Sequence, residues 1–218
     1  MIRQIRPLWH LQGFACAAML MWCADAAEAQ TAAAISIRGF AEAGYETFQA
    51  TRTFNAIFQE DAGRVFGGGG EVVFRPGIFV RVSASKYENT GERALRLENE
   101  LFRLGIPLTM TIVPIEVSGG YRFRHGATLV PYVGAGVSSH GYRETSRFAE
   151  ATENVDERFT GYQFLGGLEY RISRWIAAAG EVQYTTVPDA IGGGGLSAEF
   201  NERDLGGTTV RVRVIVGR

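Results

Sequence analysis

The last stretch of the chain, Thr208 to Val216, constrains the fold most, because it alternates strictly between two kinds of residue. Successive side chains of an extended strand point to opposite sides. One face therefore carries only valines and the other carries two arginines: Val210, Val212, Val214 and Val216 against Arg211 and Arg213. A tilted β-strand needs about nine to eleven residues to cross a bilayer. The stretch therefore has the length and the pattern of a transmembrane β-strand.

Seven earlier segments show the same alternation and are predicted as strands: Ile35–Phe48, Val65–Phe74, Ile78–Tyr87, Thr109–Phe123, Thr128–Tyr142, Phe159–Ile172 and Ile176–Thr186. Their connectors alternate between long polar segments, at 49–63, 88–107, 143–158 and 187–207, and short turns, at 75–77, 124–127 and 173–174. We interpret the long connectors as loops. For 88–107 we expect the stems of the loop to continue the neighbouring strands above the membrane, and a short amphipathic helix is the competing interpretation. Short turns at one end and long loops at the other are typical of transmembrane barrels. We expect an all-β fold, an eight-stranded antiparallel up-and-down transmembrane β-barrel.

The N-terminus has the features of a secretory signal peptide. Arg3 and Arg6 precede an apolar, alanine-rich run, which ends in Ala27-Glu28-Ala29. A charged region, an apolar region and a small-x-small site are the three parts of such a signal. We therefore predict a signal peptide at residues 1–29 and a barrel domain at 30–218. An uncleaved anchor helix is the alternative, and the polar residues that interrupt the apolar run disfavour it.

The polar faces of the strands carry a matched set of charges. These are six arginines and six carboxylates: Arg38, Arg81, Arg122, Arg171, Arg211 and Arg213 with Glu42, Glu46, Glu71, Glu116, Glu169 and Glu181. Alternation alone also suits a soluble lipocalin-type barrel with an apolar interior. Within a membrane, an arginine on the lipid face costs roughly 2 to 4 kcal/mol, so six would cost about 12 to 24 kcal/mol. We therefore expect these charges to face inward as a lumen ion-pair network that plugs the barrel.

The apolar faces carry aromatic residues toward the strand ends, where an interfacial girdle would lie. The predicted aromatic girdle is Tyr45, Phe74, Tyr121, Phe123, Tyr170 and Tyr184. Phe40 and Phe48 break a polar face, and we expect them to pack inside, near the ends of the barrel. These features favour a barrel that presents its apolar face to lipid.

Short motifs add a resemblance to a known family. The motifs are Arg-Gly-Phe at 38–40, Pro-Tyr-Val-Gly-Ala-Gly at 131–136 and Gly-Gly-Leu-Glu-Tyr-Arg at 166–171. With the signal peptide and the eight strands, they resemble the outer-membrane β-barrel domain family of small Gram-negative proteins, of the OmpA, OmpX and opacity type. The resemblance implies a location in the cell outer membrane, outer-membrane lipid and the barrel-insertion machinery as partners, and no shared catalytic residues. The chain departs from such barrels at its C-terminus, where Val216-Gly217-Arg218 replaces the usual final aromatic residue.

Composition and spacing narrow the function classes. The net charge of −1 and the absence of a basic block give no reason to expect a nucleic-acid partner. We expect no cofactor, no metal site and no enzyme activity, and we expect a monomer. Ser138 and His140 share a polar face and would suit a lipid hydrolase only if lipid reached them. The leading hypothesis is a structural, surface-interaction or adhesion role through long extracellular loops whose partner is unknown. The alternative is a narrow conduit for small, apolar molecules, and the third is an outer-membrane lipid hydrolase.

Overall fold

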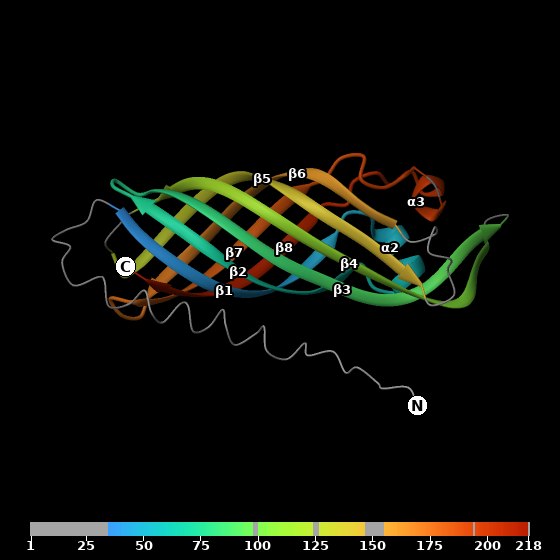
Figure 1. Ribbon diagram of the computed structural model, residues 1–218, viewed down its shortest axis with the longest axis horizontal. Coiled ribbons are helices and arrows are strands. Elements are labelled where there is room, and N and C mark those ends of the chain that lie inside the picture. The colour runs from blue at the N-terminus through green and yellow to red at the C-terminus, as the bar shows by residue number, and fades with distance from the viewer. Residues whose placement is uncertain (1–34, 98–99, 124–126, 147–154, 194, 218) are drawn as a thin grey trace, which may run out of the picture. The chain divides into compact units, whose positions relative to one another are not determined.

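The computed structural model describes residues 35–97, 100–123, 127–146, 155–193 and 195–217. Eight antiparallel strands pair in chain order and close into one barrel (Figure 1). The strands are β1 (Ile35–Phe48), β2 (Ala62–Phe74), β3 (Ile78–Leu97), β4 (Glu100–Arg122), β5 (Leu129–Ser146), β6 (Val155–Arg171), β7 (Ile176–Thr186) and β8 (Gly207–Gly217). The predicted fold class is confirmed. The predicted signal peptide lies outside the described residues.

Strand β8 shows how the alternating residues form the wall of the barrel, with apolar side chains outside and charged side chains inside. It pairs with β7 on one side and with β1 on the other, which closes the ring. Val212 is 64% exposed on the outer surface, whereas Arg213 is 2% exposed inside. Because closure pairs both edges of every strand, the backbone polar groups are satisfied without water, as a membrane span requires.

The first long connector is not the loop that the sequence analysis predicted. It contains the helix α2 (Thr51–Phe58), and β2 already begins at Ala62. Phe54, Ile57 and Phe58 have helical spacing, so one face of α2 is apolar and packs against the barrel. The prediction of a loop was wrong here because this spacing was overlooked in a segment that is polar on average.

The second long connector is mostly strand. The β3–β4 hairpin pairs from Glu88 with Thr111 up to Leu97 with Glu100, with one register shift between Glu92 and Ala94. The expectation that the stems of this loop continue the strands is confirmed. The helix interpretation was wrong, because continuing the ladder satisfies the backbone hydrogen bonds of both strands. In Figure 1 the hairpin projects beyond α2.

The other two long connectors also depart from simple loops, whereas the predicted turns at 75–77 and 173–174 lie between strands as expected. Strand β5 continues to Ser146 and β6 begins at Val155, so both extend into the predicted loop at 143–158. The predicted loop at 187–207 contains the short helix α3 (Gly195–Glu199). Most of the predicted turn at 124–127 lies outside the described residues.

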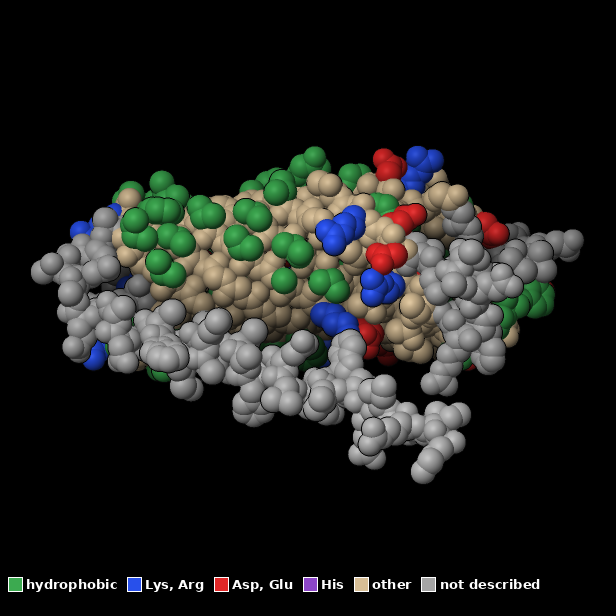
Figure 2. Space-filling view, in the orientation of Figure 1, with side chains coloured by type: hydrophobic (Ala, Val, Ile, Leu, Met, Phe, Trp, Pro, Cys, Tyr) green, Lys and Arg blue, Asp and Glu red, His purple; other side chains and the backbone are tan. Residues whose placement is uncertain are grey.

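The outer wall divides into an apolar band and a charged rim. Figure 2 shows hydrophobic side chains gathered over one part of the barrel, with Lys, Arg, Asp and Glu side chains beginning beyond them toward the hairpin. In β3 the outward apolar residues end at Ala84, and the next outward residue is Lys86. No helix among the described residues is long and apolar enough to cross a membrane.

Candidate functional site

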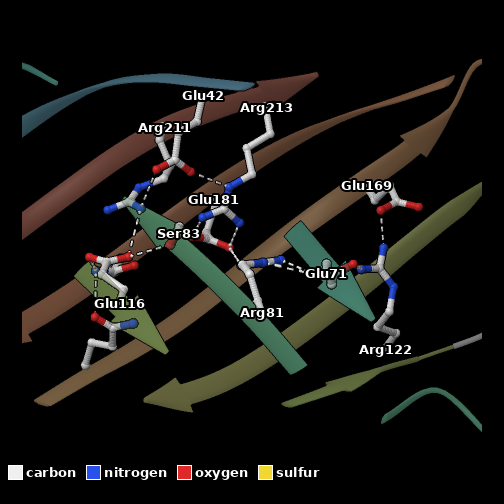
Figure 3. A network of polar contacts seen from close by, with 12 residues as sticks. Glu42, Glu71, Arg81, Ser83, Glu116, Arg122, Glu169, Glu181, Arg211 and Arg213 are labelled. Carbon is white, nitrogen blue, oxygen red and sulfur yellow. Dashed lines mark hydrogen bonds and ion pairs between the residues drawn. The ribbon is translucent and has the colours of Figure 1, made fainter. Parts of the chain in front are cut away.

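The lumen holds a continuous network of ion pairs, and Glu71 is the hub of its lower half, nearest the short turns. One Glu71 oxygen accepts hydrogen bonds from Arg38 and from Arg122, the latter at 2.9 Å. The other accepts from two nitrogens of Arg81, at 3.1 and 2.8 Å. Glu169 also binds Arg38, at 3.0 Å, and Arg122. Three arginines and two carboxylates from five strands are therefore joined by shared ion pairs, and Figure 3 shows Arg81 and Arg122 with Glu71.

Glu181 connects this half to the upper half, nearest the long connectors. Arg81 Nη1 donates to Glu181 at 2.8 Å, and Arg213 Nη2 donates to the same carboxylate at 2.7 Å. Arg213 then reaches Glu42 at 2.7 Å. Arg211 donates to Glu42 at 3.2 Å and to Glu116, which ends the chain of pairs, at 3.3 Å. The pairs thus run without a break through much of the lumen.

The structure brings together eleven of the twelve residues predicted for the lumen network: Arg38, Glu42, Glu71, Arg81, Glu116, Arg122, Glu169, Arg171, Glu181, Arg211 and Arg213. Arg171 is at the lower rim, partly exposed, with its Nε 3.6 Å from Glu169. Glu46 points inward above the network and forms no ion pair with any described residue. Arg171 and Glu46 lie at opposite ends of the charged layer.

Aromatic side chains fill the space between the arginines. The Arg81 guanidinium lies 5.0 Å from the ring centre of Phe79, 5.5 Å from that of Tyr132 and 5.7 Å from that of Phe40. Arg213 lies 5.0 Å from the Phe40 ring. Such contacts stabilise a cation that has been removed from water. Phe40 packs inside as expected, but among the charges rather than near an end.

Phe79 and the glycines that make room for these rings were not among the residues predicted for the site. A Cβ at Gly120 would lie 2.7 Å from the Phe79 ring, and one at Gly167 would lie 2.4 Å from the Tyr132 ring. Both glycines occupy inward positions of the alternation, and that signal was available in the sequence. Ring and guanidinium together leave the charged layer densely packed.

An apolar cluster closes the lumen above the charged layer. Phe48 and Phe54 stack with ring centres 4.2 Å apart, and Tyr87 meets Phe48 edge-on at 4.9 Å. Val187 and Leu205, from the last connector, pack into the same cluster. We call this cluster, formed by α2 and the last connector over the barrel wall, the apolar cap.

Glu202 fastens the last connector to the N-terminus of α2. Its carboxylate accepts hydrogen bonds from the backbone N–H groups of Arg52 and Thr53, at 3.0 and 2.9 Å, and from the Thr53 hydroxyl at 2.6 Å. A carboxylate at a helix N-terminus satisfies free N–H groups and interacts favourably with the helix dipole. The two segments of the apolar cap are thereby joined by charge-assisted bonds.

The model of a known family, the outer membrane protein beta-barrel domain, matches residues 14–214. The chain belongs to this family. The resemblance inferred from the sequence is confirmed, and membership places the chain in the bacterial outer membrane. No curated protein sequence matches the chain.

Solved structures of outer-membrane proteins share the fold. Neisserial surface protein A aligns with a TM-score of 0.50 and 12% identity, covering 86% of this chain and 98% of its own. A major outer membrane protein from Thermus thermophilus aligns with a TM-score of 0.51 and 13% identity, covering 85% of this chain and 100% of its own. At these identities the likeness concerns the fold alone.

In this outer-membrane barrel the predicted girdle residues all lie on the outer wall, where lipid would contact them. Phe74, Tyr121, Phe123 and Tyr170 lie toward the short-turn end, whereas Tyr45 and Tyr184 lie toward the long-connector end. Tyr121 and Phe123 meet edge-on with ring centres 5.2 Å apart. Phe66 and Tyr162 were not predicted as girdle residues, although both are exposed near the long-connector end and follow the same alternation.

Ser138 and His140 lie inside the barrel wall, below the apolar cap. The Ser138 hydroxyl and His140 Nε2 are 2.9 Å apart, and both side chains are buried. A Cβ on Gly161 would lie 2.7 Å from the Ser138 oxygen, so the backbone of β6 crowds the hydroxyl. Lipid contacts the outer wall, so this arrangement suits a hydrogen bond within the lumen better than attack on a lipid. Among the described residues, no cluster of His, Cys, Asp and Glu could hold a metal ion.

Proposed function

We propose that the protein is a closed outer-membrane barrel that serves as a rigid base for surface interaction, rather than as a conduit for solutes. The observation that carries this proposal is the filled lumen. The ion-pair network spans the charged layer, and the apolar cap covers it. An eight-stranded barrel has an interior just wide enough for side chains to fill. A solute would have to separate several buried ion pairs to pass.

The β3–β4 hairpin is the element best placed to make the interaction. Strand β4 pairs with β5 only from Leu108 onward, so Glu100–Pro107 is paired with β3 alone among the described residues. The outward apolar residues of β4 end at Val113. At about 3.4 Å per residue, the hairpin extends roughly 40 Å along the strand beyond that point. It therefore reaches well out of the membrane.

Strand β4 exposes apolar side chains near the end of the hairpin, between the charged residues Glu100 and Arg103 and beyond them. Leu101, Phe102 and Leu104 are 41, 46 and 50% exposed, and we call these three residues the hairpin tip. Exposed apolar groups that no membrane covers mark surfaces that bind other molecules. Gly105, with φ of +64°, and Pro107 interrupt the regular strand edge, which disfavours addition of another strand. The contact is therefore made by side chains.

Two measurements test the proposal. In planar bilayers the purified protein should show no steady conductance, and a reproducible open channel would contradict the closed lumen.

In nanodiscs, the variant with Leu101, Phe102 and Leu104 replaced by Ser should lose retention on a panel of immobilised extracellular proteins and intact cells. The control replaces Glu100 and Arg103 by Ser and should be retained like the unchanged protein. Equal retention of all three proteins would refute the role of the hairpin tip.

A further inference from the structure

The outer wall carries a row of positive charge where the apolar band ends. Lys86 of β3 and Arg158 of β6 both point outward there. The flanking pairs, Ala84 with Ile115 and Tyr87 with Ile112, place Lys86 opposite Val113. Val113 pairs with Gly141, and Gly141 pairs with Arg158. The four residues thus form one row across four neighbouring strands, which we call the cation row.

The spacing within the cation row is fixed by the sheet. Neighbouring strands lie about 4.8 Å apart, so Lys86 and Arg158, three strands apart, are separated by roughly 14 Å at the backbone. Little projects from the barrel wall between Lys86 and Arg158, because Gly141 has no side chain and the Val113 side chain is small. A Cβ at Gly141 would only touch the Val113 carbonyl oxygen at 3.5 Å, an ordinary contact. The row is therefore a shallow shelf with a cation at each end.

The nearby carboxylates are in the next row, farther from the apolar band. Glu88 lies two residues beyond Lys86 and pairs with it at 2.6 Å, and Asp156 pairs with Arg143 at 2.7 Å. The Lys86 ammonium holds the pKa of Glu88 below its usual range, so this carboxylate stays charged. Arg158 forms no ion pair with any described residue. The charges closest to the membrane are therefore both positive.

The Lys86–Glu88 pair leaves Lys86 able to bind a second anion. The side chains of Lys86 and Glu88 are 57 and 51% exposed. Exposed ion pairs contribute little, about 0 to 1 kcal/mol, so the ammonium can turn toward another partner at small cost. An ammonium also has three donors, and one carboxylate does not use them all.

We propose that the cation row binds the headgroup of an outer-leaflet lipid that carries two phosphate groups, one at Lys86 and one at Arg158. The acyl chains of that lipid would lie against the apolar band directly below, and the sugar or glycerol portion would rest on Gly141 and Val113. Both phosphate sites are on the outer wall, so this binding is independent of the lumen and of the hairpin tip.

Native mass spectrometry of the full barrel in detergent tests the proposal, with a diphosphorylated glycolipid as the probe and its monophosphorylated and phosphate-free forms as comparisons. The affinity should fall in that order. The double variant Lys86→Ala with Arg158→Ala should bind the diphosphorylated form about 30-fold more weakly, because each basic residue near an anionic headgroup contributes about a fivefold change in affinity. The variant Gly141→Asp, which places a negative charge on the shelf, should weaken binding without removing a cation.

The matched control replaces Arg75 and Arg174, two exposed arginines at the short-turn end, by Ala. It changes the net charge equally and should bind the diphosphorylated lipid like the unchanged protein. Heat-modifiable gel migration verifies that every variant is folded. The proposal is overturned if the phosphate-free glycolipid binds equally well, or if the control double variant loses as much affinity as the Lys86 and Arg158 variant.

Discussion

Replacing Glu71 by Gln removes one negative charge from the hub of the lumen network while keeping the size of the side chain. Glu71 is 3% exposed and bonds Arg38, Arg81 and Arg122. Removing one partner of a buried ion pair costs about 3 to 5 kcal/mol, because the remaining charge is left in a place without water. Each of the three arginines keeps a second carboxylate, Glu169 or Glu181. We therefore expect the lower value, about 3 kcal/mol.

The assay is urea unfolding of the barrel in lipid vesicles, followed by the fluorescence of Trp175 at the end of the apolar band. The control is Asp156→Asn, which breaks an ion pair whose side chains are 63 and 66% exposed and should cost no more than about 1 kcal/mol. Adding Arg81→Met to Glu71→Gln restores the charge balance and should recover part of the loss. If Glu71→Gln destabilises the barrel no more than Asp156→Asn does, the charged layer does not hold the lumen together.

Two further predictions concern packing and the apolar cap. Gly167→Ala should lower the free energy of unfolding by about 1 to 3 kcal/mol, because its Cβ would collide with the Tyr132 ring. The control Gly166→Ala should change it little, because nothing lies within 4 Å of a Cβ there. Equal effects of the two substitutions in urea unfolding would show that the ring can move aside. Glu202→Ala should speed amide hydrogen exchange in α2 about tenfold, because it removes the carboxylate from the helix N-terminus. The control Glu199→Ala, on the exposed side of α3, should leave the exchange rate unchanged. Unchanged exchange in the Glu202 variant would mean that apolar packing alone holds α2 in place.

Much of the outer wall follows from local pattern, whereas the long connectors do not. The inward or outward direction of Val212 and Arg213 depends only on the alternation, which any reader of the sequence can see. The structure of 88–107 depends on whether its two halves pair as a β-hairpin. The charge and leucine content of this segment is compatible with a loop, a helix or a strand, so composition alone does not decide between them. Helix α2 carried a usable signal in its Phe54 and Phe58 spacing, but its burial depends on Leu205 and Val187 arriving from the far end of the chain.

The sequence by itself determined the eight membrane-crossing segments, the face that each presents to lipid, and the stock of charges that must turn inward. The direction of each side chain alternates with a period of two residues, and placing a charge on the lipid face is energetically costly. These properties are therefore fixed within each strand. Only the tertiary structure decided which charges meet. Arg38 and Glu169 are 131 positions apart and come together because closure of the ring and the stagger of its strands set their heights in the lumen. The same closure aligned Lys86 with Arg158 on the outer wall, since a row across four strands exists only once their registers are set.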